Sequence, residues 1–462
     1  MDAISLLARK LADQVRKWDD IVVVSHYDAD GITSAAILVS ALRGIGKDVR
    51  FINVKQLYSD QVAEIRDMGS AFIFSDLGIG QISVLLDQMR APFIVLDHHE
   101  IPPGREYPYL LHPHIFGIDG SRELSGAGVS YLFARELSGR KDLAALAVVG
   151  AVGDVQLVDN ALVGYNRNIL RDAIESGKIF VYRDLALYGR VSRPLPYMFV
   201  YSTDPILPGL TANEAAVYDF LDAAGVSYRD ENGALLSYVD LSESDKRKLF
   251  TALSMYLLSR GWNSQRLQSL LGEVYELTDE DIHSPLRDVR EYATLLNACG
   301  RHGRPEVGVH VAMGDRGKYY DEAIALLHRH RAALRKGVDY VVNNGLIQLE
   351  SIQYFHAYDV IPASVVGIVA GMVYSSGIAS FRKPIVGMAY EDEEHVKVSA
   401  RATSRLVLAG VDLSKAMRVA AERVGGEAGG HKPAAGARIP RGVEEEFLRQ
   451  LDRVVSSQLG AT

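Results

Sequence analysis

The chain has 462 residues, of which 48% are hydrophobic and 23% charged, with a formal net charge of −8. This composition indicates a folded globular protein and excludes disordered, collagen-like and coiled-coil chains. No stretch approaches the roughly 18 consecutive apolar residues of a membrane span, no secretory signal is evident, and the single cysteine, Cys299, excludes an intrachain disulfide. We therefore expect a cytoplasmic protein without membrane association.

The first 170 residues alternate between short apolar runs and helical stretches. The apolar runs, typical of buried strands, lie at residues 21–24, 71–74 and 93–96, and a further strand is predicted at 49–54. Helices are predicted at residues 31–42, 82–89 and 143–152. Because strands that alternate with helices form parallel sheets covered on both faces, residues 1–170 are predicted to be an α/β domain.

The remainder of the chain is predicted to form two further domains. Residues 171–335 form a mainly helical insertion domain. Residues 336–462 form a smaller C-terminal α/β domain, with strands at 339–342, 346–352, 384–390 and 395–400 and helices at 363–374 and 413–424.

Acidic and histidine residues follow three of the predicted strands and one predicted helix. In chain order they are His26, Asp28 and Asp30, then Asp76, then Asp97, His98 and His99, and finally Asp154. The carboxyl ends of parallel strands meet at one edge of a sheet, so we expect these groups to converge there.

Clustered carboxylates repel one another, and a divalent cation relieves that repulsion. Carboxylate and imidazole ligands suit Mn²⁺ or Mg²⁺, and the lack of cysteines argues against structural zinc. Bound cations would also reverse the local field, so the net charge does not exclude nucleic acid. Each segment alone has a plainer explanation: Asp30 as a helix cap, Asp76 in a turn, and His98 and His99 as ordinary core or surface histidines. Their conjunction favours a metal site.

A second group of residues points to phosphate binding in the last domain. Its members are Ser399, Arg401, Gly429, Gly430 and His431. A glycine-rich loop over residues 429–436 would let backbone amides approach a phosphate closely. The guanidinium group of an arginine can donate two parallel hydrogen bonds to the same anion. A tight turn with a surface arginine is the alternative for either segment alone.

These motifs resemble those of the DHH phosphoesterase superfamily, and within it the archaeal RecJ-like proteins. The resemblance rests on His26-Tyr27-Asp28-Ala29-Asp30-Gly31, Asp76, Asp97-His98-His99 and Asp154, and on Gly429-Gly430-His431 with Ala434-Ala435-Gly436, which is similar to the signature of the DHH-associated domain. The stretches 207–211 (LPGLT) and 295–301 (LLNACGR) are shared as well, so that the resemblance covers nearly the whole chain.

The resemblance implies two divalent metal ions between the first and last domains, with Mn²⁺ expected and Mg²⁺ the alternative. The implied metal ligands are Asp28, Asp30, Asp76, His98 and Asp154, with Asp76 as the bridge and His99 against the scissile phosphate. His26, two residues before Asp28, departs from the family pattern and is expected as a further ligand. Pyrophosphatase-like members carry a ligand histidine four residues before the first aspartate. Val24 stands there in this chain, and this difference disfavours the small-phosphate hydrolases.

The expected activity is two-metal hydrolysis of phosphodiesters by a single-strand-specific exonuclease in DNA replication or repair, with His99 and Asp76 as catalytic residues. The substrate is single-stranded DNA, with RNA left open, and the polarity and oligomeric state are open too. One alternative is a hydrolase of short oligonucleotides or cyclic dinucleotides. The other is a replication scaffold, because a eukaryotic relative without catalysis serves the replicative helicase and archaeal RecJ-like proteins associate with the GINS complex.

Overall fold

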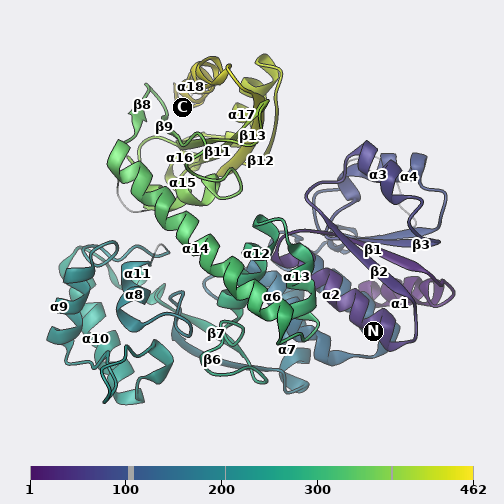
Figure 1. Ribbon diagram of the computed structural model, residues 1–462, viewed down its shortest axis with the longest axis horizontal. Coiled ribbons are helices and arrows are strands. Elements are labelled where there is room, and N and C mark those ends of the chain that lie inside the picture. The colour runs from purple at the N-terminus through teal and green to yellow at the C-terminus, as the bar shows by residue number, and fades with distance from the viewer. Residues whose placement is uncertain (1, 102–108, 203, 376–377, 461–462) are drawn as a thin grey trace. The chain divides into compact units, whose positions relative to one another are not determined.

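The structure is a computed structural model that describes residues 2–101, 109–202, 204–375 and 378–460. The chain forms two compact units (Figure 1). The first consists of Met1–Met198 and Val217–Leu327, and the second of Phe199–Ala216 and His328–Thr462. The division into domains 1–170, 171–335 and 336–462 stays a prediction. Within the described ranges, no helix is long and apolar enough to cross a membrane.

A five-stranded parallel sheet is the centre of the first unit. Its strands are β1 (Ile21–His26), β2 (Val49–Val54), β3 (Ala71–Ser75), β4 (Phe93–Leu96) and β5 (Leu110–Leu111). They lie in the order β2-β1-β3-β4-β5, and every pair is parallel. In this order the chain switches direction between β1 and β3, and ligands of open α/β sheets bind at such a switch point.

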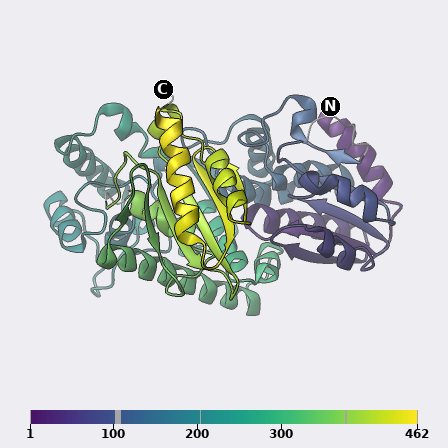
Figure 2. The same ribbon diagram turned by 90° about the horizontal axis from the view of Figure 1, so that it is seen from above.

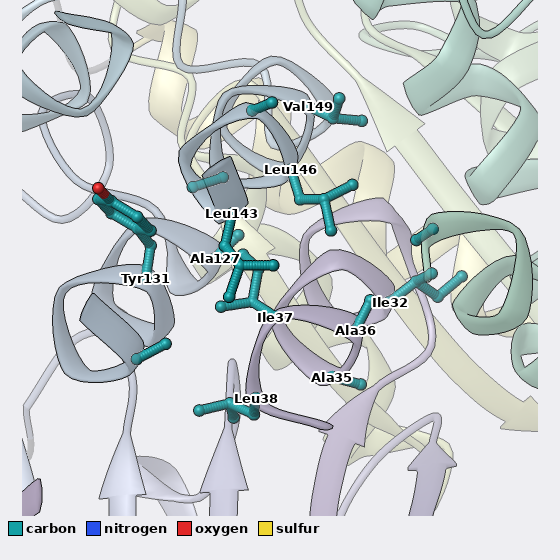
Figure 3. Packing of buried hydrophobic residues seen from close by; sticks show 14 of the residues in the cluster. Ile32, Ala35, Ala36, Ile37, Leu38, Ala127, Tyr131, Leu143, Leu146 and Val149 are labelled. Carbon is teal, nitrogen blue, oxygen red and sulfur yellow. The ribbon is translucent and has the colours of Figure 1, made fainter. Parts of the chain in front are cut away.

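Helices cover both faces of this sheet because its buried strands are apolar on both sides. Ile21 and Val23 point into one core and Val22 and Val24 into the other. The larger core packs against α1 (Ala3–Val15), α2 (Ala29–Gly44), α5 (Gly126–Ser138) and α6 (Ala144–Gly153). Figure 3 shows aliphatic side chains of α2 packed among residues of α5 and α6. The smaller core packs against α3 (Ser59–Ile65) and α4 (Ile82–Gln88).

The middle of the chain is mainly helical, as predicted, and also contains a strand pair. Its helices are α7 (Gly164–Glu175), α8 (Leu195–Val200), α9 (Glu214–Ala224), α10 (Glu243–Ser259), α11 (Ser264–Gln268), α12 (Val289–Arg301), α13 (Pro305–Ala312) and α14 (Lys318–Asn344). The antiparallel strands β6 (Ile179–Leu185) and β7 (Leu271–Leu277) were not expected. Short 3-10 helices lie at Ile79–Gln81, Pro113–Phe116, Lys141–Leu143 and Tyr238–Asp240.

A six-stranded sheet organises the second unit. Its strands are β8 (Ile347–Gln348), β9 (Gln353–His356), β10 (Ile385–Tyr390), β11 (His395–Arg401), β12 (Glu427–His431) and β13 (Ala434–Pro440), in the order β12-β13-β11-β10-β9-β8. Only β9 and β10 pair in parallel among the described strands of this sheet. Its helices are α15 (Val366–Ser375), α16 (Ser404–Leu408), α17 (Leu413–Arg423) and α18 (Glu444–Gly460), and α18 lies along the sheet (Figure 2). These two α/β assemblies and the helical region confirm the predicted fold class.

Three local predictions for this unit were wrong. The strand expected at 346–352 is reduced to β8, because residues 349–352 form the turn of the β8–β9 hairpin, in which Leu349 N donates to Ile352 O (3.0 Å). Residues 339–342 belong to α14 rather than to a strand, because the buried positions Gly337 and Val341 lie four residues apart on one helix face, where Gly337 packs closely on Val369. Tertiary packing here outweighs the β-propensity of valine. Residues 429–436 form the β12–β13 hairpin rather than a loop, with Lys432 and Pro433 as its turn.

Candidate metal centre

His26 and Asp28 lie at the carboxyl end of β1. Asp28, not Asp30, is the N-cap of α2, and its carboxylate accepts a hydrogen bond from Gly31 N (3.1 Å). His26 Nδ1 lies 3.0 Å from Asp28 Oδ2 and 3.7 Å from Asp76 Oδ2. Burial lowers the pKa of His26, but the charge of Asp28 and the hydrogen bond to it together outweigh burial, so the pKa is raised. His26 and Asp28 therefore form an ion pair beside Asp76.

Asp30 and Asp76 are buried against the N-terminus of α5, each 2% exposed. The carboxylate of Asp30 accepts hydrogen bonds from Gly126 N (2.7 Å) and Ala127 N (3.0 Å). A Cβ on Gly126 would lie 2.5 Å from Asp76 Oδ1, and one on Gly150 would lie 2.5 Å from Asp30 Oδ1. Only glycine therefore allows α5 and α6 to approach the carboxylates this closely.

Both carboxylates have a raised pKa. Burial is the main cause for each, and the charge of Asp30 raises the pKa of Asp76 further. Asp76 also adopts a left-handed backbone conformation (φ 56°) directly after β3. Such residues cluster at functional sites, because strain persists only where the surroundings hold the backbone in place.

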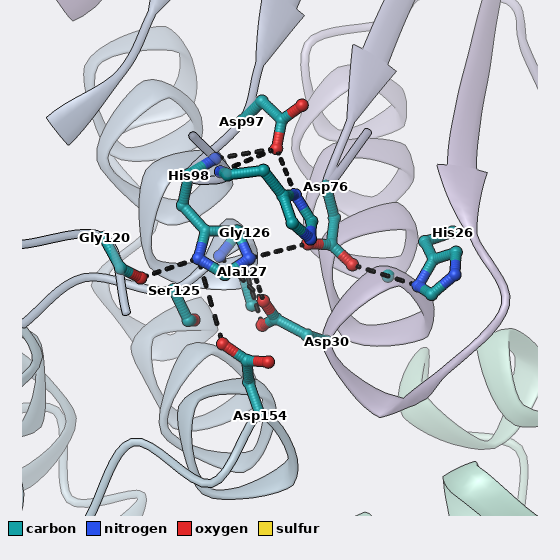
Figure 4. Close-up of polar contacts among 12 residues, drawn as sticks. His26, Asp30, Asp76, Asp97, His98, Gly120, Ser125, Gly126, Ala127 and Asp154 are labelled. Carbon is teal, nitrogen blue, oxygen red and sulfur yellow. Dashed lines mark hydrogen bonds and ion pairs between the residues drawn. The ribbon is translucent and has the colours of Figure 1, made fainter. Parts of the chain in front are cut away.

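His98 turns one ring nitrogen toward these carboxylates. Its Nδ1 donates to the carbonyl of Gly120 (2.7 Å), which leaves Nε2 at 3.2 Å from Asp76 Oδ1 and 3.7 Å from Asp30 Oδ2 (Figure 4). A hydrogen bond from the far nitrogen to a carbonyl is the usual way in which a ligating histidine is oriented. The ring of His98 is therefore fixed with Nε2 available to a metal.

His99 is oriented by Asp97 rather than by the cluster. Its Nδ1 donates to Asp97 Oδ1 (2.8 Å), and Asp97 also accepts from the backbone amides of Ile79 (2.9 Å) and His98 (2.7 Å). Burial lowers the pKa of His99, but the hydrogen bond to Asp97 and the charge of that carboxylate together outweigh burial and raise the pKa to about 9. The His99 side chain is 56% exposed, with Nε2 as its open nitrogen.

Asp154 ends α6 as its C-cap, and the next two residues close the helix. Val155 N donates to Val152 O (3.1 Å) and Gln156 N to Ala151 O (3.0 Å), the two bonds of a Schellman motif. The left-handed position of this motif, normally glycine, is Val155 (φ 59°), which is 83% exposed. Burial and the charge of Asp30 raise the pKa of Asp154 to about 7.

The structure brings all the sequence-predicted ligands together with His99. Figure 4 shows His26, Asp30, Asp76, His98 and Asp154 of this set. Three overlapping groups have ligand atoms within 4.8 Å of one another: Asp76, His98 and His99; His26, Asp28 and Asp76; and Asp30, His98 and Asp154. Asp76 and His98 each belong to two groups. Buried carboxylates with raised pKa values and an oriented imidazole are donors that fit hard-to-borderline divalent cations. The residues therefore fit a metal centre.

The residues predicted to bind phosphate lie on adjacent strands of the second unit. Ser399, Gly436 and Gly429 are cross-strand neighbours, as are Arg401, Ala434 and His431, while Gly430 pairs with Ala435. Arg401 and Ser399 also lie beside Gly367 of α15. The structure thus brings Ser399, Arg401, Gly429 and His431 to one side of the sheet, with Gly430 in the neighbouring row.

Sequence reasoning missed the residues that hold the ligands in place. Gly126, Gly150 and Gln156 contact the cluster directly or through one hydrogen bond, yet none stands in a recognisable spacing. The glycines contribute by lacking a side chain, which composition alone does not reveal.

Comparisons with known proteins identify the family of the chain. Three family models match in succession: the DHH family N-terminal domain over residues 20–151, the DHH-CID domain over 187–271 and the DHHA1 domain over 351–457. An uncharacterized protein of Methanocaldococcus jannaschii is 31% identical over 450 residues, which cover 95% of this chain and 94% of that protein. The chain belongs to the DHH family.

Within the DHH family the chain is RecJ-like, as predicted. The single-stranded-DNA-specific exonuclease RecJ of Thermus thermophilus is 32% identical over 183 residues, which cover 36% of this chain and 26% of that protein. A crystal structure of RecJ from the same organism in complex with Mn²⁺ has a TM-score of 0.59 at 19% identity, covering 98% of this chain and 55% of that one. CDC45 from Entamoeba histolytica has a TM-score of 0.69 at 13% identity, covering 98% and 99%. These two structures show the fold alone, and the family supports a phosphoesterase.

Proposed function

We propose that this DHH-family protein is a metal-dependent exonuclease that removes nucleotides from the ends of single-stranded DNA or RNA. The observation that carries the proposal is the cluster of four aspartates and three histidines at the switch point of the parallel sheet. Held without a cation, buried like charges destabilise the fold. Binding a phosphodiester through divalent metal gives this cluster a function that no packing role supplies.

Each side chain has a separate task in the proposed reaction. His26, Asp28, Asp30, Asp76, His98 and Asp154 would hold two divalent cations, Mn²⁺ or Mg²⁺, with Asp76 shared between them. When bound, such cations supply positive charge to the phosphate and lower the pKa of water. His99, whose Nδ1 is held by Asp97, would use Nε2 to donate a hydrogen bond to a phosphate oxygen beside Asp76 and His98. In the second unit, Ser399, Arg401, Gly429, Gly430 and His431 would hold a phosphate of the strand.

The proposal is tested by degradation of end-labelled oligonucleotides. Single-stranded DNA and RNA of increasing length, labelled at either end, are incubated with Mn²⁺ or Mg²⁺. Asp76→Asn is the inactive variant, and Asp87→Asn, which removes the same charge from an exposed position on α4, is the matched control. We expect stepwise release of mononucleotides by the wild type and the control, lost in Asp76→Asn. The label that is released first gives the polarity.

Other outcomes favour the alternatives. Activity that falls as the substrate lengthens would favour a hydrolase of short oligonucleotides or cyclic dinucleotides. Metal binding without cleavage of any strand would favour a replication scaffold, an alternative that the CDC45-like fold keeps open. Association with GINS stays a prediction that a pull-down with the purified complex would test. A role in replication or repair and a cytoplasmic location also stay predictions.

A further inference from the structure

Gln156 is a buried residue that contacts two parts of the metal centre at once. It is 1% exposed, and its Nε2 donates to the carbonyl of Gly120 (2.8 Å) and to Asp154 Oδ2 (2.8 Å). The Gly120 carbonyl is the group that accepts the hydrogen bond from His98 Nδ1. One amide group therefore holds both a predicted carboxylate ligand and the anchor of a predicted imidazole ligand.

The orientation of this amide is itself fixed. Gln156 Oε1 accepts a hydrogen bond from Asn166 Nδ2 (2.6 Å), so that its NH₂ group must face Gly120 and Asp154. Asn166 is 2% exposed and also accepts from Ser125 N (3.4 Å) at the start of α5. The backbone of Gln156 is held by the Schellman motif that follows Asp154. Every polar atom of the Gln156 side chain therefore has a partner, and none is left to bind substrate.

We infer that Gln156 is a positioning residue that sets the geometry of the metal centre through Asp154 and the Gly120–His98 hydrogen bond. The inference rests on the proposed metal site. Partners of this kind, one bond removed from the metal, control affinity because they restrict the rotation of the ligands and set which nitrogen of a histidine is free. Without the amide, Asp154 loses its hydrogen-bond donor, and the Gly120 carbonyl keeps only its bond from His98.

The test compares two buried glutamines in the full chain. Gln156→Met keeps the side-chain shape and removes its hydrogen bonds. The matched control is Gln353→Met in the second unit, because Gln353 is equally buried and its Nε2 also donates to two carbonyls, those of Ser380 (2.7 Å) and Lys383 (2.9 Å). Mn²⁺ affinity is measured by electron paramagnetic resonance titration of free Mn²⁺, and stability by urea unfolding in EDTA.

We expect Gln156→Met to weaken Mn²⁺ binding about 10–100-fold and Gln353→Met to bind within about twofold of wild type, although both variants lose stability. Cleavage by Gln156→Met should approach the wild-type kcat at saturating Mn²⁺. An unchanged Mn²⁺ affinity of Gln156→Met, or an equal loss in Gln353→Met, overturns the inference. If Gln156→Met does not fold, Asn166→Ala replaces it, with weakened Mn²⁺ binding expected and unchanged binding overturning the inference. Wild-type protein that binds no Mn²⁺ would instead overturn the metal centre itself.

Discussion

Replacing Asp76 by asparagine separates the two roles of this carboxylate, because one stabilises bound metal and the other destabilises the metal-free fold. Asparagine keeps the side-chain shape and tolerates the left-handed conformation of residue 76 (φ 56°). Alanine would add backbone strain to the loss of charge. A change in Asp76→Asn therefore comes from the lost charge and from the amide that replaces one carboxylate oxygen, not from backbone strain.

The magnitude follows from the spacing of the carboxylates. Ligand oxygens of Asp28 and Asp76 lie within 4.8 Å of each other, a separation at which two unit charges repel by about 3 kcal/mol at an effective dielectric constant of about 20. His26, between the two, offsets part of this repulsion. We expect the free energy of unfolding of the metal-free variant to exceed that of wild type by about 1–2 kcal/mol. For a chain of this size, each kcal/mol raises the Tm by about 2–4 °C at most.

The pH dependence has a definite sign. The pKa of Asp76 is raised in the folded protein, mainly by burial. A raised pKa means that the folded state binds its proton more tightly than the unfolded state, so the metal-free wild type loses stability as pH rises above the unfolded value of 3.8. The advantage of Asp76→Asn should therefore grow with pH and vanish near pH 4.

Differential scanning fluorimetry in EDTA and in Mn²⁺ checks both roles at once. Metal that binds only the folded protein raises its stability by RT ln(1 + [M]/Kd). We expect Mn²⁺ to raise the Tm of wild type and of Asp87→Asn, and to leave Asp76→Asn nearly unchanged. A metal-free Asp76→Asn that melts several degrees below wild type would refute the repulsion argument. A full Mn²⁺ shift in that variant would remove Asp76 from the metal centre.

Three further predictions concern stability alone and are measured by urea unfolding in EDTA. Val155→Gly should stabilise the protein by roughly 0.5–1 kcal/mol. The left-handed conformation costs a non-glycine residue about 1–2 kcal/mol, and the valine side chain, which is 83% exposed, makes few contacts that would be lost. A destabilised variant would contradict this prediction. Gly150→Ala should destabilise by about 1–3 kcal/mol, since its Cβ would lie 2.4 Å from Ala127 Cβ, whereas Gly44→Ala, with no atom nearer than 3.9 Å, should be neutral. Arg190→Met should lower the free energy of unfolding by about 3–5 kcal/mol. This buried arginine pairs with Asp184 (2.6 Å) and lies over the ring of Tyr238. A loss below 1 kcal/mol would show that water solvates Asp184 in the variant.

The parallel sheet was predictable because three of its strands contain short, wholly apolar runs, at residues 21–24, 71–74 and 93–96. A run such as residues 21–24 has no polar face, so it has to be covered on both sides. The strand order β2-β1-β3-β4-β5 was not available from the sequence, although it decides that β1 and β3 are neighbours. The prediction that the acidic groups converge nevertheless succeeded, since the carboxyl ends of parallel strands share an edge in any order.

Predictions failed where one segment depends on another for its conformation. Residues 339–342 resemble a strand, but Val341 is buried within α14 while its neighbour Val342 is exposed. The strands β6 and β7 escaped notice because charged residues interrupt both, and their pairing joins segments that are far apart in the chain. A local sequence pattern does not show which distant segment a strand will pair with.

The same distinction separates the ligands of the metal centre from the residues that aim them. A ligand is visible in the sequence because its chemistry is its own: a carboxylate or an imidazole after a buried strand. Gln156 has no such mark, since the hydrogen bonds that give it a role come from Gly120, Asp154 and Asn166, which only the folded chain assembles. A sequence motif therefore identifies the ligands of a metal centre, whereas the metal affinity also depends on neighbouring residues that the motif does not contain.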